Sequence, residues 1–138
     1  MSRVAALVVD SSALLDYLAR QRRAQQIARL ITVEVALHAP ECIDLEMLSV
    51  LRRWELAGLV DASKAVALRG LFDQLPVVRH PLQPHNDRVW SLRQRITVSD
   101  AYYVSLAEAL RAPLLTTDGR LARTVDSLAG VDVVPLGD

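Results

Sequence analysis

The spacing of apolar and polar residues changes several times along this chain, and each change marks an expected element. Residues 4–9 are apolar without a break, which is typical of a strand buried on both faces of a sheet. Residues 41–56 repeat apolar side chains with the period of a helix, and Gly58 is placed to end it. Further strands are expected at residues 37–39, 77–79, 113–117 and 131–134, and further helices at 12–20, 25–35, 64–75, 85–90, 100–111 and 120–125.

This alternation of strands and helices predicts an α/β fold, in which helices flank a mostly parallel central sheet. The whole chain, residues 1–138, is expected to form one domain. Ser11 or Ser12 is expected to cap the first helix, Asp61 or Ser63 the helix at 64–75, and Ser99 the helix at 100–111. Hydrophobic residues make up 51% of the chain and aromatic residues only 4%, so the core must be mainly aliphatic, as parallel sheets prefer.

Composition restricts the possible partners and compartments. The sixteen basic and sixteen acidic residues cancel, so the overall charge gives no indication of a nucleic-acid ligand. The longest uncharged apolar stretch, residues 4–9, is far too short to span a membrane, and the N-terminus lacks the apolar segment of a secretion signal. Cys42 is the only cysteine, which excludes an intrachain disulfide and favours a reducing, cytoplasmic location.

Four acidic residues are the strongest candidates for chemistry. Asp10 and Asp118 directly follow expected strands, and ligands of parallel sheets bind at the carboxyl ends of the strands. Glu46 borders the apolar side of its helix, and Asp100 begins the apolar stripe of another. Several carboxylates in one pocket repel one another, so their convergence would require a cation. Hard ions such as Mg²⁺ or Mn²⁺ take oxygen ligands and assist attack on phosphate esters.

Each acid also has a purely structural interpretation. Asp10 is suited to cap the following helix, and Asp118 precedes glycine in a common turn pair. Glu46 can reach water or pair with Arg53, and an acid at the position of Asp100 is favoured by the helix dipole. Taken one at a time these signals are weak, and the argument for a metal site rests on all four.

The segments that carry the acids resemble the PIN-domain family, most closely the VapC-type toxins of bacterial toxin–antitoxin pairs. The order and spacing agree, with 36 positions from Asp10 to Glu46 and 18 from Asp100 to Asp118. The closing segment GVDVVPL and the chain length agree as well. The matching segments are VVDSSALLDYL, LEMLSVLRR, SDAYYVSLAEAL and LLTTDGRLAR.

This resemblance implies a PIN-like three-layer sandwich and a Mg²⁺- or Mn²⁺-dependent endoribonuclease. Its expected products carry 5′-phosphate and 3′-hydroxyl ends. Asp10, Glu46, Asp100 and Asp118 are then the metal ligands and catalytic acids. Supporting roles are implied for Ser12, two positions after the first acid, and for Thr116 or Thr117 beside the last. The implied partners are an RNA substrate and a small antitoxin protein.

Other sites and functions are less well supported. His38, His80 and His85 form no zinc pattern with Cys42 and are interpreted as structural or surface residues. The chain has neither of the glycine-rich nucleotide-binding motifs. The alternatives to a toxin are a PIN-like housekeeping nuclease or a catalytically silent module for RNA binding or assembly. All four acids are present, which favours the enzyme.

We also expect a homodimer, because the apolar residues of segments 14–18 and 66–72 exceed what one sheet can cover. For the antitoxin, the expected contact surface is the groove between the first helix and the helix that carries Glu46. Its candidate contacts are Leu14, Leu15, Leu48 and Leu51.

Overall fold

Four parallel strands form the central sheet, in the order β3-β2-β1-β4. The computed structural model describes residues 5–128 and 130–137. In register, Leu7 of β1 pairs with Leu37 of β2, and Leu37 pairs in turn with Val77 of β3. The strands are β1 (Ala5–Val9), β2 (Val35–Pro40), β3 (Val77–His80) and β4 (Leu114–Leu115).

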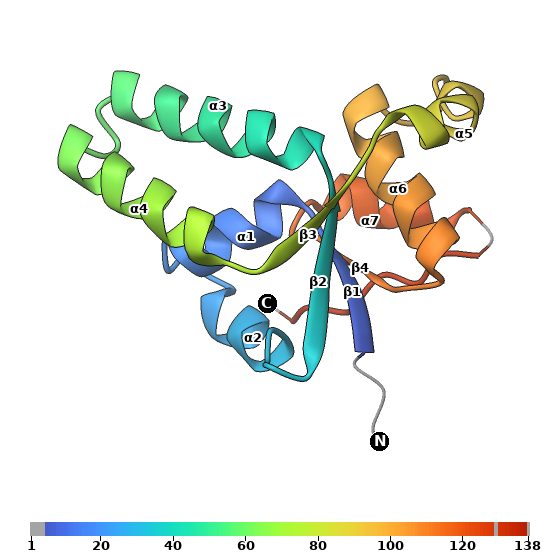
Figure 1. Cartoon of the computed structure of the whole chain (residues 1–138), viewed down its shortest axis with the longest axis horizontal. Helices are drawn as coiled ribbons and strands as arrows, with labels where there is room; N and C mark the ends of the chain where they lie inside the picture. The colour runs from blue at the N-terminus through green and yellow to red at the C-terminus, as the bar shows by residue number, and fades with distance from the viewer. Residues whose placement is uncertain (1–4, 129, 138) are drawn as a thin grey trace.

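Helices cover both faces of this sheet and complete a three-layer α/β sandwich (Figure 1). Helices α1 to α4 lie on one side, and α5 to α7 lie on the other. The α helices are α1 (Ser11–Leu18), α2 (Ala24–Leu30), α3 (Cys42–Leu56), α4 (Ala62–Gln74), α5 (Asn86–Ser91), α6 (Val98–Leu110) and α7 (Gly119–Asp126). A 3₁₀ turn, Gln83–His85, leads into α5. The α/β class and the parallel sheet predicted from the sequence are confirmed.

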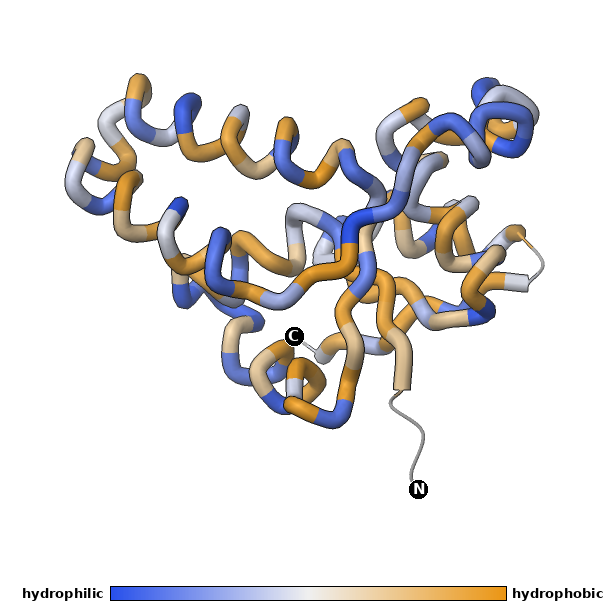
Figure 2. The backbone as a smooth tube through the Cα atoms, in the orientation of Figure 1, coloured by the Kyte–Doolittle hydropathy of each residue, from blue (hydrophilic) through white to orange (hydrophobic). Residues whose placement is uncertain are grey.

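The core is aliphatic and lies between the sheet and its two helical layers. Val8, Val9, Leu114 and Leu115 have no exposed surface, so the strands are buried on both faces. Figure 2 shows the same pattern as hydrophobic colour over most of the length of the central strands. Helix α6 contributes the most buried positions of any described helix, because it packs directly on β1, β2 and β4. The position of Asp100 is therefore fixed by the packing of its helix on the sheet.

Three predicted elements are clearly shorter than expected, and one of them is the strand expected at 113–117, which is reduced to Leu114–Leu115. The helix expected at 25–35 ends at Leu30, because Val35 already pairs with Ala5 in the sheet. The strand expected at 131–134 is reduced to a single parallel bridge between Leu114 and Val133. Its partner β4 has only two residues, which leaves little backbone for a fifth strand to pair with.

Helix starts depend on side chains that the sequence identified only in part. Asp61 caps α4 by accepting a hydrogen bond from the N–H of Lys64 at 2.7 Å. Helix α3 ends at Leu56, as predicted, and Gly58 follows its C-cap with a positive φ of 74° that suits glycine. The prediction that Ser99 caps α6 is wrong. Thr97 is the cap, and its hydroxyl accepts the N–H of Asp100 at 3.1 Å.

The apolar surface differs from the expectation for the dimer and antitoxin contacts. Leu14, Leu15 and Leu51 are buried in the core, so three of the four leucines expected to contact an antitoxin are not available. Leu48 is 46% exposed, and Val66 on the neighbouring helix α4 is 72% exposed. No helix among residues 5–128 and 130–137 is long and apolar enough to cross a membrane.

Candidate active site

Asp10 lies at the carboxyl end of β1, where the chain turns into α1. Asp10 is 6% exposed, and its carboxylate caps α1 by accepting the N–H of Ala13 at 2.9 Å. The prediction that Ser11 or Ser12 caps this helix is therefore wrong, because both serines already lie inside α1. Ser12 donates its hydroxyl to Oδ1 at 2.7 Å, and Thr116 donates to Oδ2 at 2.5 Å. The structural interpretation of Asp10 as a cap and the functional one are thus compatible, because one oriented carboxylate serves both.

Thr116 and Ser12 connect the two strand ends that carry Asp10 and Asp118. The hydroxyl of Thr116 accepts the N–H of Asp118 at 3.0 Å while it donates to Asp10. Ser12 accepts the N–H of Thr117 at 3.1 Å. Asp118 itself caps α7, with Oδ1 accepting the N–H of Arg120 at 3.0 Å and of Leu121 at 3.2 Å. Asp10 and Asp118 therefore belong to one hydrogen-bonded unit at the β1–β4 edge.

Glu46 is half-buried on α3 and points toward α6. Tyr103 donates its hydroxyl to Oε1 at 2.6 Å, and Ser99 donates to Oε2. Burial raises the pKa of Glu46, the hydrogen bond from Tyr103 opposes this shift, and the charge of Asp100 adds to it. The suggested pairing of Glu46 with Arg53 is replaced by these two hydroxyl contacts.

Asp100 is the electrostatic centre of the group. Its charge raises the pKa of both Asp10 and Glu46, and the charge of Asp118 raises the pKa of Asp100 itself. In each case burial is the first cause, and a neighbouring carboxylate adds to it. Burial moves the pKa of Asp10 from 3.8 to about 6 despite its three hydrogen-bond donors. The four acids are thus within electrostatic reach of one another.

The acids are not assembled into a ready-made metal cage. Within residues 5–128 and 130–137, no three acidic, histidine or cysteine side chains are close enough together to hold a metal ion. The chemistry of the group nevertheless fits a hard cation. All four side chains offer oxygen atoms. Burial first, and a neighbouring carboxylate second, raise the pKa of Asp10, Glu46 and Asp100, and a cation would oppose both effects.

Comparison with known proteins places this arrangement in a family. Residues 7–126 match the PIN domain. The chain belongs to the PIN-domain family. It is 41% identical over 117 residues to Ribonuclease VapC3 of Mycobacterium tuberculosis, covering 85% of each chain. It is 34% identical over 128 residues to Ribonuclease VapC12 of the same organism, covering 93% of this chain and 98% of that one.

Comparison with solved structures shows the same fold. The crystal structure of VapBC2 from Rickettsia felis, bound to a DNA fragment from their promoter, superposes on this PIN domain with a TM-score of 0.69. The match covers 96% of this chain and 99% of that one at 9% identity. At that identity the likeness is one of fold. The resemblance to the PIN and VapC families inferred from the sequence is confirmed.

Three hydroxyl groups of this PIN domain's acidic site were not identified from the sequence. Ser99 was predicted to cap a helix and Tyr103 was not singled out, yet both donate to Glu46. Ser11 also lowers the pKa of Glu46 through a hydrogen bond. Ser99 and Tyr103 are four residues apart on one helix, so they share a face beside Asp100. The sequence feature that could have identified them is the pair of hydroxyl residues, Ser99 and Tyr103, spaced by one helical turn next to Asp100.

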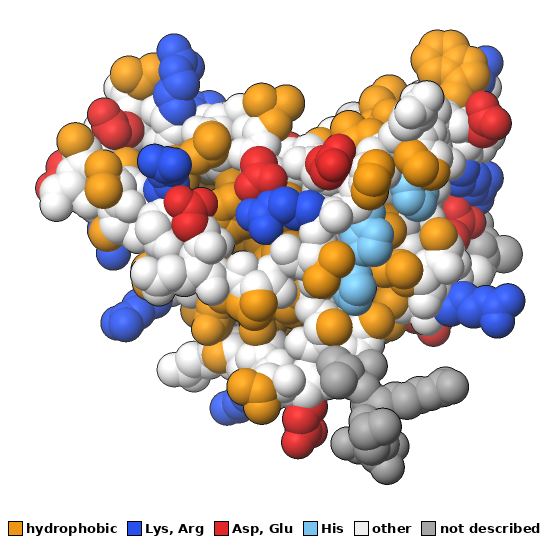
Figure 3. Space-filling view, viewed as in Figure 1, with side chains coloured by type: hydrophobic (Ala, Val, Ile, Leu, Met, Phe, Trp, Pro, Cys, Tyr) orange, Lys and Arg blue, Asp and Glu red, His pale blue; other side chains and the backbone are white. Residues whose placement is uncertain are grey.

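The three histidines gather on one face of the PIN domain, as the pale-blue side chains in Figure 3 show. His38 Nδ1 lies 2.8 Å from His80 Nε2, and His85 Nδ1 lies 2.7 Å from the hydroxyl of Ser105. These contacts tie β2 to β3 and the start of α5 to α6. They agree with a structural interpretation of the histidines.

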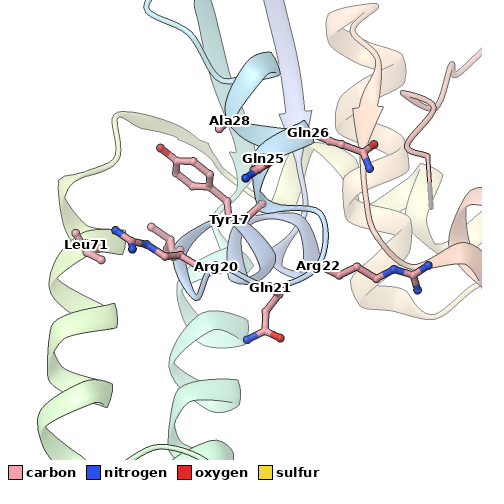
Figure 4. A pocket seen from close by; sticks show the side chains of 10 residues that line it. Tyr17, Arg20, Gln21, Arg22, Gln25, Gln26, Ala28 and Leu71 are labelled. Atoms are coloured by element: carbon pink, nitrogen blue, oxygen red, sulfur yellow. The ribbon is translucent and has the colours of Figure 1, made fainter.

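A wider cavity, of about 650 Å³, lies away from the acids between α1, α2 and α4 (Figure 4). Its wall mixes polar and apolar side chains, among them Arg20, Tyr17 and Leu71, and Arg22 lies on the opposite side from Tyr17. None of the four acids lines it. The cavity is therefore separate from the acidic site of this PIN domain.

Proposed function

We propose that this PIN domain is a metal-dependent endoribonuclease and the toxin of a toxin–antitoxin pair. The observation that carries the proposal is the coupling of Asp100 to Asp10, Glu46 and Asp118 at one edge of a parallel sheet. The names of the related proteins VapC3 and VapC12, both ribonucleases, support the same activity.

Asp10, Glu46, Asp100 and Asp118 are the residues that would hold Mg²⁺ or Mn²⁺. A divalent cation bound there would acidify an attacking water and offset the negative charge that develops on the phosphate. The protein's own contribution is to fix the carboxylates before substrate arrives. Three donors orient Asp10, and two hydroxyls orient Glu46, so neither acid has to lose much side-chain entropy when a cation binds.

The reaction proposed is hydrolysis of an RNA phosphodiester bond. Water attacks phosphorus, the P–O3′ bond breaks, and the products are a 5′-phosphate and a 3′-hydroxyl. The leaving 3′ oxygen takes up a proton. No side-chain nucleophile is needed.

The test is cleavage of a labelled single-stranded RNA with Mg²⁺ or Mn²⁺, with EDTA, and with variants of the four acids. We expect EDTA to abolish cleavage. Asp10→Asn, Glu46→Gln, Asp100→Asn and Asp118→Asn should each reduce the rate by at least about a hundredfold, since each removes a charge from the cation site. Asp73→Asn is the matched control, because Asp73 is an exposed acid of α4 that pairs with Arg69.

Cleavage that survives exhaustive chelation would contradict the metal mechanism. If the wild-type protein binds RNA but never cuts it, the catalytically silent module becomes the correct interpretation. If it cuts RNA but does not arrest growth when expressed alone in bacteria, it is a housekeeping nuclease.

We further propose that a small antitoxin neutralises the enzyme. A solved structure of the same fold, VapBC-5 from Mycobacterium tuberculosis, is a member of the VapBC family of toxin-antitoxin systems, which supports such a pairing. RNA and antitoxin are both made in the cytoplasm, so we place the activity there. Expression of this chain alone should arrest bacterial growth, and co-expression with the antitoxin encoded beside it should restore growth. Equal growth of wild type and Asp10→Asn at equal soluble levels would refute the toxin assignment.

We also propose a homodimer, now on a narrower surface than the sequence indicated. Leu45 and Leu48 of α3 are 71% and 46% exposed, and Val66 of α4 is 72% exposed. Leu48 and Val66 line the same shallow groove between the two helices. Leu45 and Leu48 are three residues apart and share a helix face. An exposed apolar strip of this kind favours burial against a second copy.

A further inference from the structure

Three arginines from two distant segments surround a cavity beside Asp100. Arg93 and Arg95 come from the connection between α5 and α6, and Arg120 comes from the first turn of α7. All three are exposed, and together with Asp100 they line a cavity of about 340 Å³. Thr97 and Thr124 line it as well. We call this the arginine pocket.

The three arginines differ in how firmly they are held. Arg93 lies over the exposed ring of Trp90, 4.6 Å from its centre, and donates to the carbonyl of Trp90 at 2.8 Å. Arg95 donates to the hydroxyl of Ser127 at 2.7 Å. Arg120 makes no side-chain hydrogen bond to the described residues, but its charge lowers the pKa of Asp100. Two guanidinium groups are thus pre-oriented, and the third stands next to the acidic site.

This concentration of cations differs from the chain as a whole, whose basic and acidic residues cancel. A neutral protein gains no general attraction for a polyanion, so any affinity for RNA must come from a local site. The planar guanidinium group donates in a fork that matches phosphate oxygens, and the hydroxyl of Thr97, which accepts the N–H of Asp100, keeps its own proton to donate. The arginine pocket has both, and Asp100 is in its wall.

We propose that the arginine pocket binds the RNA backbone at a phosphodiester group that flanks the scissile one. The inference rests on the proposed function, since it assigns the substrate-holding part of the same site. In this arrangement the acids act on the scissile phosphate, and the neighbouring phosphate is bound by Arg93, Arg95 and Arg120. This contact holds the RNA strand next to Asp100, and it does not depend on the identity of the bases.

The test measures binding rather than cleavage. A labelled single-stranded oligoribonucleotide of about 12 nucleotides is titrated against protein by fluorescence anisotropy, at several salt concentrations. All proteins carry Asp10→Asn so that the RNA stays intact. The pocket variant combines Arg93→Gln, Arg95→Gln and Arg120→Gln. The matched control combines Arg29→Gln, Arg53→Gln and Arg111→Gln, which removes the same charge from exposed positions outside both the pocket and the groove between α3 and α4.

We expect the pocket variant to bind at least about tenfold more weakly than the parent and the control to stay within about twofold. The slope of log Kd against log salt should fall by about 0.7 for each phosphate that the protein no longer neutralises, or about 2 for all three arginines. Arg120→Gln alone is the folding-safe variant, because that side chain makes no hydrogen bond to the described residues. It should reduce the slope by about 0.7, and Arg120→Lys should recover part of the affinity.

The outcomes separate this inference from the proposed function. If wild-type protein cleaves RNA with Mg²⁺ and the pocket variant binds as tightly as the control, the arginine pocket is not the backbone site and the nuclease assignment stands. If both triple variants weaken binding equally, the effect is one of net charge and the inference fails. If wild-type protein neither binds nor cleaves RNA, the proposed function and this inference fail together.

Discussion

Asp10 shows at the scale of a single residue how an acidic site is prepared for a cation. Two hydroxyls and a backbone N–H stabilise its charged form, but burial outweighs them and the pKa rises from 3.8 to about 6. The folded protein therefore keeps a proton on Asp10 more readily than the unfolded chain does. This contribution to stability is full below pH 3.8 and is lost as the pH rises through about 6.

Because the ionised form of Asp10 is disfavoured in the folded protein, we predict that Asp10→Asn stabilises the metal-free protein at neutral pH. A shift from 3.8 to about 6 corresponds to ~3 kcal/mol, which is the upper limit of the gain at pH 7. The gain should vanish near pH 4, where wild-type Asp10 is largely protonated. Asparagine also caps helices, so the cap of α1 is kept. The measurement is denaturant unfolding in EDTA at pH 4, 5.5 and 7.

Asp61→Asn is the control for this experiment, because Asp61 caps α4 through the same kind of bond but is exposed. It should show no comparable gain at pH 7. A loss of stability in Asp10→Asn that is the same at every pH would mean that Asp10 serves mainly as a helix cap. Addition of Mg²⁺ should stabilise wild type more than the asparagine variant if Asp10 is a cation ligand.

At the scale of the element, α6 combines a structural start with a functional first turn. Thr97 caps the helix, while Ser99, two residues later, points across to Glu46. The sequence analysis predicted Ser99 as the cap, because its hydroxyl directly precedes the apolar stripe, and did not consider Thr97. Packing decides between them, since α6 lies directly on the sheet and its orientation directs Ser99 toward α3.

We predict that Thr97→Ala mainly lowers stability, whereas Ser99→Ala mainly lowers the cleavage rate. Thr97→Ala should destabilise the protein by about 1 kcal/mol through loss of the cap, with little change in the cleavage rate after correction for unfolding. Ser99→Ala should change stability less and reduce the rate at saturating Mg²⁺ by roughly tenfold, because Glu46 loses an orienting donor. Thermal unfolding and cleavage assays on the same preparations give both quantities. The reverse pattern would restore Ser99 as the cap.

At the scale of the whole molecule, the exposed apolar strip on α3 and α4 predicts self-association. Leu48→Glu combined with Val66→Glu should convert a dimer at micromolar concentration into a monomer, because each places a charge in an apolar contact. Both side chains are exposed in the single chain, so folding should be retained. Sedimentation velocity gives the oligomeric state.

Val33→Glu is the matched control, because Val33 is fully exposed in the turn before β2 and belongs to neither helix. It should leave the sedimentation behaviour unchanged. A wild-type protein that stays monomeric throughout the micromolar range would refute the dimer. A double variant that sediments like wild type would place the interface elsewhere.

The sequence by itself determined the elements whose residues carry a clear pattern of apolar and polar positions. The unbroken apolar run that became β1 and the helical period of α3 needed no long-range information, because strand burial and helix amphipathicity are written in consecutive residues. The short β4 and the failed strand around Val133 could not be derived in this way. Their pairing depends on where α6 delivers the chain to the sheet edge.

For the candidate site, too, the sequence determined one part and the tertiary structure the other. The sequence by itself selected Asp10, Glu46, Asp100 and Asp118, because acids at strand ends and on apolar helix faces are unusual enough to stand out. Only the tertiary structure decided their partners: Thr116 across from Asp10, Tyr103 and Ser99 around Glu46, and three arginines beside Asp100. Those contacts join residues 53 to 106 positions apart, or segments of different helices. Packing of α6 against the parallel sheet brings them together, and no local pattern encodes that proximity.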